Sequence, residues 1–245
     1  MPAEMENLVI MDATADIEKI SSMVDFVFCA VDMPKDEIKA LEERYAKAEC
    51  PVVSNNSAHR FTPDVPMVVP ELNADHIEVI ADQRKRLGTK RGFIAVKSNC
   101  SLQSYVPAIY PLDKAGYKVE DVLVCTYQAI SGAGKTFERW PEMVDNVIPF
   151  IGGEEEKSEQ EPLKIWGHLE NGVIVPAKAP IISAHCVREA DEAPVEQRIP
   201  AQTTERNAHA ALKIAVKTGL RPIVLFKILK ERMRGARQIH FLLVD

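Results

Sequence analysis

The sequence lacks the features of a membrane protein, a disulfide scaffold and a nucleic-acid-binding protein. Its apolar runs fall well short of the ~18 uncharged residues that a transmembrane helix requires, so no membrane partner is expected. The five cysteines are odd in number and include no CxxC pair, which favours a reduced, cytoplasmic protein without a metal site. The formal net charge of -6 argues against nucleic acid as the partner.

What the sequence does contain is enough apolar surface for one large core or two smaller ones. Of its 245 residues, 46% are apolar and 27% are charged, as is typical of a globular protein. The charge is uneven, because residues 1–188 carry 20 basic and 29 acidic side chains, whereas residues 189–245 carry 10 and 7. Residues 189–245 are therefore interpreted as a divergent basic tail of uncertain role.

Alternating strand and helix patterns predict a parallel α/β sheet in the N-terminal part of the chain. The expected elements are strands at residues 24–31, 51–54 and 92–96, with one helix opening at Pro34 and another over residues 73–87. Asn73 is the expected N-cap of the second helix, and Gly88 its stop. No glycine-rich phosphate loop follows a first strand, so residues 1–97 are interpreted as a partial Rossmann-type domain with an open strand edge.

The pattern changes after Glu120 and predicts a second domain, of mixed α+β type, over residues 98–188. A long strand is expected at residues 121–130, followed by a glycine-started acidic helix within residues 148–167. Two short strands are expected around the prolines of residues 172–188. The whole chain is thus expected to be α/β, with a parallel sheet followed by a mixed sheet.

Cys100 carries the strongest local signal for chemistry. It follows the expected strand at residues 92–96 and lies at an expected helix start, between Asn99 and Ser101. Free N–H groups and the helix dipole at such a position lower the pKa of a thiol and favour the nucleophilic thiolate. The alternative is a small buried cysteine with no reactive role. The local sequence alone leaves both interpretations open.

Five longer segments carry a family resemblance. They are SNNSAHR (54–60), SNCS (98–101), TYQAISGAGK (126–135), NVIPFIGGEEEKSEQEPLK (146–164) and ISAHCVR (182–188). In this order and spacing the chain resembles the aspartate-semialdehyde dehydrogenase family over residues 1–188. The resemblance implies an NADP-binding Rossmann domain followed by a catalytic and dimerisation domain of the glyceraldehyde-dehydrogenase type. It also implies a cytoplasmic homodimer or homotetramer that reduces aspartyl-β-phosphate with NADPH in lysine, threonine and methionine biosynthesis.

The resemblance implies a nucleophile and its immediate neighbours. Cys100 would attack the acyl phosphate to give an acyl-thioester, and Asn99 would stabilise the oxyanion that develops. Gln128 would orient the substrate beside the thiol. Ser131 and Gly132 would lie against the nicotinamide half of NADP.

The resemblance further implies charged groups that bind the substrate. Arg188 would bind the α-carboxylate as a planar fork, and Glu154 would bind the ammonium group. Lys157, three residues further along the same helix face, would bind phosphate together with Arg60.

The resemblance stops after Arg188, where the family's Gly-His-Thr triplet, with its acid/base histidine, has no counterpart. His185 is a poor substitute, because residues three apart on a strand point to opposite faces; His59, next to Arg60, could approach the phosphate. Two alternatives remain. One is a catalytically inactive fragment that acts only by pairing with an intact subunit, and the other is a relative of malonyl-coenzyme A reductase, in which Glu154 would have no ammonium group to bind.

Overall fold

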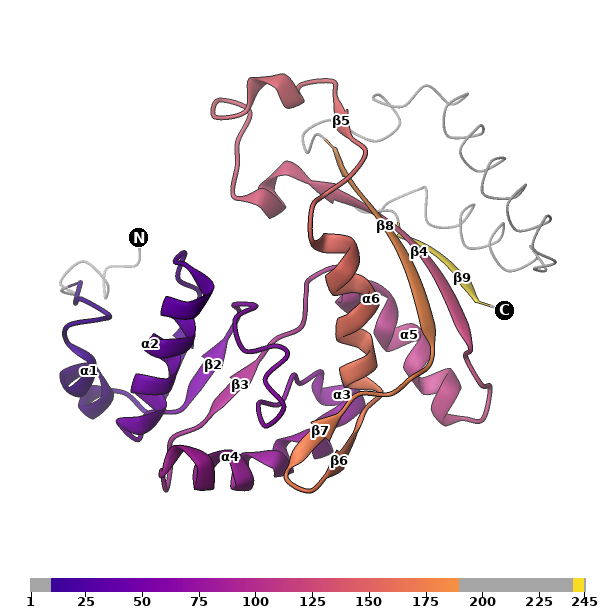
Figure 1. Cartoon of the computed structure of the whole chain (residues 1–245). Helices are drawn as coiled ribbons and strands as arrows, with labels where there is room; N and C mark the ends of the chain where they lie inside the picture. Colours follow the sequence, from indigo (N-terminus) through magenta and orange to yellow (C-terminus); the bar gives the residue numbers. More distant parts are fainter. Residues whose placement is uncertain (1–9, 190–239, 245) are drawn as a thin grey trace. The chain divides into compact units, whose positions relative to one another are not determined.

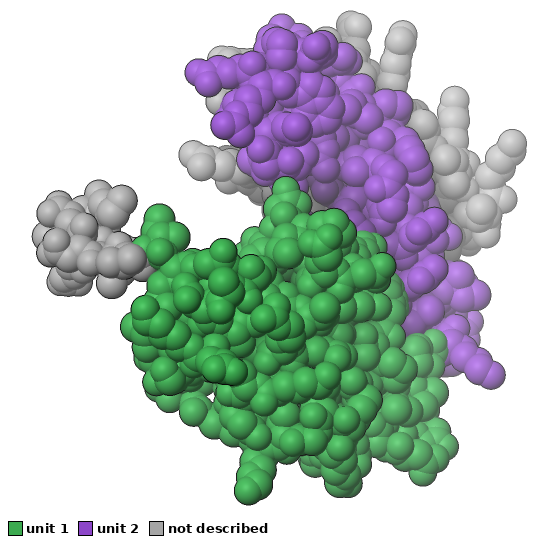
Figure 2. Space-filling view, turned by 60° about the vertical axis from the view of Figure 1, so that its left-hand side comes forward, with its two compact units in different colours: residues 1–99, 164–177 green, residues 100–163, 178–245 purple. Residues whose placement is uncertain are grey.

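The computed structural model describes residues 10–189 and 240–244. The chain divides into two compact units (Figure 2). Unit 1 comprises residues 1–99 and 164–177, and unit 2 comprises residues 100–163 and 178–245. A parallel sheet and a small hairpin belong to unit 1, and a mixed sheet belongs to unit 2.

Unit 1 is built on a parallel three-stranded sheet (Figure 1). Its strands lie side by side in sequence order: β1 (Val27–Cys29), β2 (Val52–Ser54) and β3 (Ile94–Val96). Helix α2 (Lys35–Lys47) connects β1 to β2, and helix α1 (Ile17–Met23) packs on α2. The predicted β-α-β pattern is confirmed.

The helices of unit 1 cover one face of this sheet. Side chains alternate between the two faces of a strand, and the covered positions of β2 and β3 are almost fully buried: Val52, Ser54, Ile94 and Val96. On the other face, Phe28 is 62% exposed and Val53 is 37% exposed. Parallel sheets usually have both faces covered; within the described residues, this one has a covered face only on the side of α2.

The second connection of unit 1 consists of three short helices. They are α3 (Pro70–Asn73), a 3-10 helix (Ala74–Val79) and α4 (Ile80–Leu87). Gly88 ends α4 with a φ of 73°, as predicted. The predicted N-cap role of Asn73 is wrong, because its Oδ1 accepts the N–H of Val69 at 2.8 Å and its Nδ2 donates to the carbonyl of Met67 at 3.0 Å. Asn73 therefore fixes the chain that precedes it.

A β-hairpin completes unit 1. Strands β6 (His168–Glu170) and β7 (Val173–Val175) pair antiparallel around Asn171 and Gly172, which both have positive φ. An Asn-Gly pair suits a two-residue hairpin turn of this kind. The N–H of Ile174 donates to the carbonyl of Pro63 at 2.9 Å, which ties the hairpin to the loop after β2.

Unit 2 contains the predicted mixed sheet. Its strands lie in the order β5 (Val147–Ile148), β8 (Ile181–Glu189), β4 (Asp121–Ala129) and β9 (His240–Val244). β4 and β8 are parallel, whereas β5 is antiparallel to β8 and β9 is antiparallel to β4. β8 is longer than predicted, since it pairs with β4 over nine residues. The helices of this unit are α5 (Leu102–Lys114) and the predicted acidic helix α6 (Glu154–Ile165).

Of the predicted basic tail, residues 190–239 and 245 lie outside the described residues, while residues 240–244 form β9. No helix in the described part of the chain is long and apolar enough to cross a membrane. Among residues 10–189 and 240–244, no cluster of three or more His, Cys, Asp or Glu side chains could hold a metal ion.

Candidate active site

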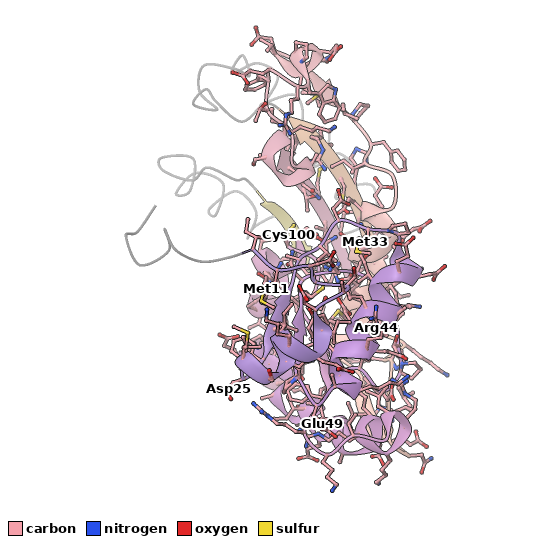
Figure 3. The ribbon with its side chains drawn as sticks, turned by 90° about the vertical axis from the view of Figure 1, so that its left-hand side faces the viewer. Met11, Asp25, Met33, Arg44, Glu49 and Cys100 are labelled. Atoms are coloured by element: carbon pink, nitrogen blue, oxygen red, sulfur yellow. The ribbon has the colours of Figure 1, made fainter. Side chains whose placement is uncertain are left out.

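The predicted nucleophile, Cys100, lies in the turn between β3 and α5 (Figure 3) and is exposed. Helix α5 begins two residues later, at Leu102, so the chain after the thiol presents the N–H groups of a helix's first turn. The remaining cysteines are buried or half-buried, and in each case burial is the main cause that raises the thiol's pKa: Cys29, Cys50, Cys125 and Cys186. Their surroundings disfavour the thiolate, which leaves Cys100 as the candidate reactive thiol.

Buried hydrogen bonds hold the Cys100 turn against α6. Ser101 Oγ lies 3.2 Å from Ser158 Oγ, and the phenol of Tyr105 donates to the carbonyl of Ser158 at 3.0 Å. Ser158 is fully buried, so these bonds are shielded from water. Sequence reasoning missed Ser158, because a single serine within a helix carries no motif.

The first turn of α6 carries Glu154 and Lys157. Gly153, with a φ of 76°, leads the chain into the helix. Lys157 Nζ donates to Glu154 Oε1 at 2.5 Å, and both side chains are partly buried. The two groups therefore share one helix face, and each balances the charge of the other.

Two neighbouring acids of α6 bind β8 instead. Glu155 Oε1 lies 2.9 Å from His185 Nδ1 and accepts the N–H of Cys186 at 3.2 Å, and Glu159 Oε1 accepts the N–H of Ala184 at 3.1 Å. These carboxylates occupy backbone donors of β8 that would otherwise be open to another strand. Glu155 and Glu159 thus have a structural role that Glu154 does not share.

Arg188, Gln128 and Gly132 come together where β8 and β4 end. Gln128 and Arg188 are paired across the two strands, and Arg188 Nη1 donates to the carbonyl of Ala129 at 2.7 Å. A Cβ on Gly132 would lie in ordinary van der Waals contact with the same Nη1, at 3.4 Å, so the glycine lies beside the guanidinium. Ser131 precedes it in the 3-10 turn Ile130–Ala133, in which residues 131–133 are exposed.

The side chains of Gln128 and Arg188 differ in their hydrogen bonds: Arg188 donates to a main-chain carbonyl, whereas the amide nitrogen of Gln128 has an unused donor among the described residues. Gln128 Nε2 is buried and has no hydrogen-bond partner in the described part of the chain, so this amide can donate to a ligand. Arg188 is only 6% exposed, whereas the side chain of His185 is 55% exposed. His185 therefore lies apart from the Arg188 guanidinium, as the strand alternation predicted.

Unit 1 carries the two other predicted ligands, Arg60 and Asn99, both of which are nearly buried. Arg60 lies in the loop after β2, and its Nη2 donates to the carbonyl of Asn55 at 3.0 Å. Lys97 Nζ donates to the side chain of Asn55 at 3.2 Å. The guanidinium of Arg60 is thus held by the start of its own loop.

His59, the histidine next to Arg60, points into unit 1. It is 2% exposed, its Nδ1 lies 3.0 Å from Thr62 Oγ1, and its Nε2 lies 3.4 Å from the carbonyl of Lys39. Burial lowers the pKa of this imidazole, against the opposing effect of Glu42, whose Oε2 is 4.0 Å from Nε2. The expectation that His59 could approach a bound phosphate is therefore wrong, because its ring is enclosed against α2.

Comparisons with known proteins cover both units. Residues 1–80 match the family described as "Semialdehyde dehydrogenase, NAD binding domain", and residues 109–195 match "Semialdehyde dehydrogenase, dimerisation domain". The aspartate-semialdehyde dehydrogenase of Methanothermobacter thermautotrophicus is 41% identical over 165 residues, which make up 67% of this chain and 46% of the relative. The enzyme of the same name from Aspergillus fumigatus is 41% identical over 169 residues, or 69% of this chain and 45% of the relative.

A solved structure agrees with these matches. The crystal structure of aspartate semialdehyde dehydrogenase with NADP from Candida albicans has a TM-score of 0.67 and 31% sequence identity, and the match covers 78% of this chain and 53% of that chain. The chain spans about half the length of the curated relatives that it matches.

Proposed function

Because this chain belongs to the aspartate-semialdehyde dehydrogenase family, we propose that it acts in the reduction of aspartyl-β-phosphate to aspartate-β-semialdehyde, a step of lysine, threonine and methionine biosynthesis. The observation that carries the proposal is the exposed Cys100 at the start of α5, in a chain whose other cysteines are buried or half-buried. The relatives matched bear the name of this enzyme. The names of these relatives favour this proposed activity over that of a malonyl-coenzyme A reductase and over the role of an inactive pairing subunit.

The first chemical step is acyl transfer to Cys100. The thiolate attacks the β-carbonyl carbon, a bond forms between Sγ and that carbon, and the bond from the carbon to the phosphate oxygen breaks, which releases inorganic phosphate. N–H groups at the start of α5 and the amide of Asn99 stabilise the oxyanion that develops. The buried amide of Gln128, with its unused donor, orients the substrate.

Charged side chains bind the three ionic groups of the substrate. Arg188 binds the α-carboxylate, because a guanidinium held by the carbonyl of Ala129 still presents a planar donor edge. Glu154 binds the ammonium group, and Lys157 binds the phosphate together with Arg60. On binding, the substrate's own charges replace the ion pair between Glu154 and Lys157.

NADPH, when bound, supplies the hydride that reduces the thioester. The exposed turn with Ser131 and Gly132, next to the Arg188 guanidinium, suits contact with the nicotinamide half. The pyrophosphate half is a poor fit, since residues 1–87 contain no glycine and the loop after β1 cannot offer a glycine-rich approach to a phosphate. We therefore assign only the nicotinamide contact to residues of this chain.

A cytoplasmic homodimer or homotetramer is the assembly we propose, on the basis of the dimerisation-domain match over residues 109–195. Oligomers of identical subunits commonly form closed symmetric assemblies. Sedimentation velocity of the purified chain measures the assembly directly, and a monomer at all concentrations tested would contradict it.

The acyl-transfer step can be tested without the cofactor. The chain is incubated with aspartyl-β-phosphate, generated in place by an aspartate kinase and ATP, and the tryptic peptide that contains Cys100 is examined by mass spectrometry. We expect an aspartyl adduct on Cys100, together with release of inorganic phosphate.

Two variants control this experiment. Cys100→Ala should abolish both the adduct and the phosphate release, whereas Cys125→Ala, which removes a half-buried thiol of β4, should leave them unchanged. An adduct on another cysteine, or none at all on the folded protein, would refute the assignment of Cys100.

A further inference from the structure

The end of helix α6 carries a buried lysine with an unusual set of partners. Lys164 is 3% exposed. Its Nζ donates to three main-chain carbonyls of one loop in unit 1: those of Arg60 at 2.8 Å, Thr62 at 2.8 Å and Val65 at 2.7 Å. These partners lie 99 to 104 residues away in the sequence.

This arrangement needs a full set of acceptors because a buried ammonium group is costly unless its donors are satisfied. An ammonium group has three donors, and the loop provides three converging carbonyl oxygens. All three carbonyls lose this donor if an apolar side chain replaces the ammonium group, and the carbonyl of Thr62 still accepts another one, the N–H of Val65 at 3.1 Å. Lys164 therefore fixes the main chain at three points between Arg60 and Val65.

The residue at one end of that path is the proposed phosphate ligand. Arg60 is held by Lys164 at its carbonyl, by Ser57 at its N–H and by Asn55 at its guanidinium. The side chain of Arg60 is 7% exposed, so it has little freedom to adopt another rotamer. A shift of the Arg60 main chain would consequently move the guanidinium with it.

We propose that Lys164 is a positioning residue for phosphate recognition, which holds the Arg60 loop so that the guanidinium is presented in one fixed place. The proposal rests on the proposed function of Arg60 in binding the substrate's phosphate. Lys164 itself does not touch the phosphate. Its ammonium group acts only on the main-chain carbonyls of the loop.

Gln83 offers a matched control, because it holds the same loop at Asp64, away from Arg60. Its Nε2 donates to the carbonyls of Asp64 and Ile94, and its Oε1 accepts the N–H of Ile94. Gln83 is fully buried, so Gln83→Met also removes buried hydrogen bonds of unit 1. It does so without touching Arg60.

The test compares the affinity for inorganic phosphate in the wild-type chain, Lys164→Met, Gln83→Met and Arg60→Ala, by titration calorimetry. Unfolding is measured in parallel, so that only folded protein is compared. We expect phosphate affinity to fall roughly tenfold or more in Lys164→Met, as is typical when a binding group is displaced, and to stay within about twofold in Gln83→Met. Arg60→Ala should abolish the specific binding.

The possible outcomes separate the two proposals. Equal losses in Lys164→Met and Gln83→Met, or no loss in either, would overturn the positioning role while Arg60→Ala still supports the phosphate site. Unchanged affinity in Arg60→Ala would overturn the phosphate role of Arg60 and the positioning role with it.

If Lys164→Met does not fold, Lys164→Arg replaces it: this variant keeps the charge but presents a planar fork to three converging oxygens. We expect it to fold and to bind phosphate roughly tenfold more weakly, and wild-type affinity in Lys164→Arg would overturn the proposal.

Discussion

At the scale of single residues, burial separates side chains of the same type into different roles. Cys100 is exposed, whereas Cys186 is fully buried beside Ser158. Glu154 pairs with Lys157 on the same helix that uses Glu155 to bind β8. Residue type and spacing therefore indicate which residues can do chemistry, and the fold decides which of them are available for it.

Cys100 should be the first cysteine to react with a small alkylating reagent. It is exposed, and burial raises the pKa of the other four thiols and so reduces their thiolate fraction. Limiting iodoacetamide followed by peptide mapping should show Cys100 modified roughly tenfold faster than any other cysteine. Faster labelling of Cys29 or Cys125 in the native protein would contradict this ranking.

Arg188 should account for carboxylate recognition. Aspartate at millimolar concentration should raise the unfolding temperature of the wild-type chain by mass action. Arg188→Ala should remove most of this rise, because the guanidinium that pairs with the carboxylate is lost. Arg139→Ala, which removes an exposed arginine of the same unit, serves as the control and should keep the full rise. A rise that persists in Arg188→Ala would place the carboxylate elsewhere.

At the scale of secondary-structure elements, the sequence predicts the helices and strands whose apolar pattern repeats locally. β1, β2, β3 and α2 follow from such patterns. The pattern failed between Pro70 and Leu87, where the Asn73 side chain bonds to residues before it and the helix is interrupted. β6 (His168–Glu170) was not predicted, since its short polar sequence shows no alternation.

In the candidate site too, the sequence predicts the residues that lie in local motifs and misses those that depend on distant contacts. The five segments identify Cys100 and its proposed substrate ligands because those residues lie within recognisable motifs. Sequence reasoning missed Ser158 and Lys164 because their partners are 28 to 104 residues away. No local periodicity encodes contacts of that range, so only the folded chain reveals them.

The junction between α2 and β3 depends on a carboxylate that binds backbone N–H groups. Glu49 follows α2 (Figure 3), and it accepts the N–H groups of Gly92, Lys90 and Arg91. These bonds lower its pKa from 4.5 to about 2, and the bond from Gly92 has the largest effect. A Cβ on Gly92 would lie 1.8 Å from the carbonyl oxygen of Ala46, so this approach requires glycine.

The stability of this junction should therefore depend on pH in the acid range. A carboxyl group whose pKa is lower in the folded state stabilises the fold above its unfolded pKa, and this contribution is lost as pH falls through the folded value. Glu49→Gln should be less stable than wild type at pH 7, and the difference should shrink between about pH 4.5 and about pH 2. Urea unfolding of both proteins across this range measures it. Glu71→Gln, at an exposed position of unit 1, is the control, and a Glu49→Gln difference that does not depend on pH would contradict the assignment.

At the scale of the whole molecule, the proposed roles fall on both units. The thiol, the amide of Gln128 and the charged ligands Glu154, Lys157 and Arg188 belong to unit 2, while Arg60 and Asn99 belong to unit 1. Lys164 and the hairpin after α6 also belong to unit 1. Residues 164–177 therefore stabilise the loop that carries Arg60, although residues 100–163 of unit 2 separate them from the rest of unit 1 in the sequence.

Purified as these 245 residues, the chain should carry out the two half-reactions with very different efficiency. Acylation of Cys100 requires groups that the chain contains, whereas the hydride step also needs a firmly bound cofactor and a positioned acid/base. Residues 1–87 contain no glycine, and no histidine lies between Glu189 and Ala208. Loss of a positioned acid/base alone lowers the rate by about 10²–10⁴, and without a glycine-rich loop the pyrophosphate has no close backbone donors.

We therefore expect an aspartyl adduct on Cys100 but weak NADP binding, and turnover at least roughly a hundredfold below that of a full-length relative assayed alongside. Phosphate release, NADP titration and a steady-state assay with semialdehyde, phosphate and NADP measure the three quantities separately. Turnover within about tenfold of the full-length enzyme would show that residues outside those assigned here supply the acid/base and the cofactor anchor.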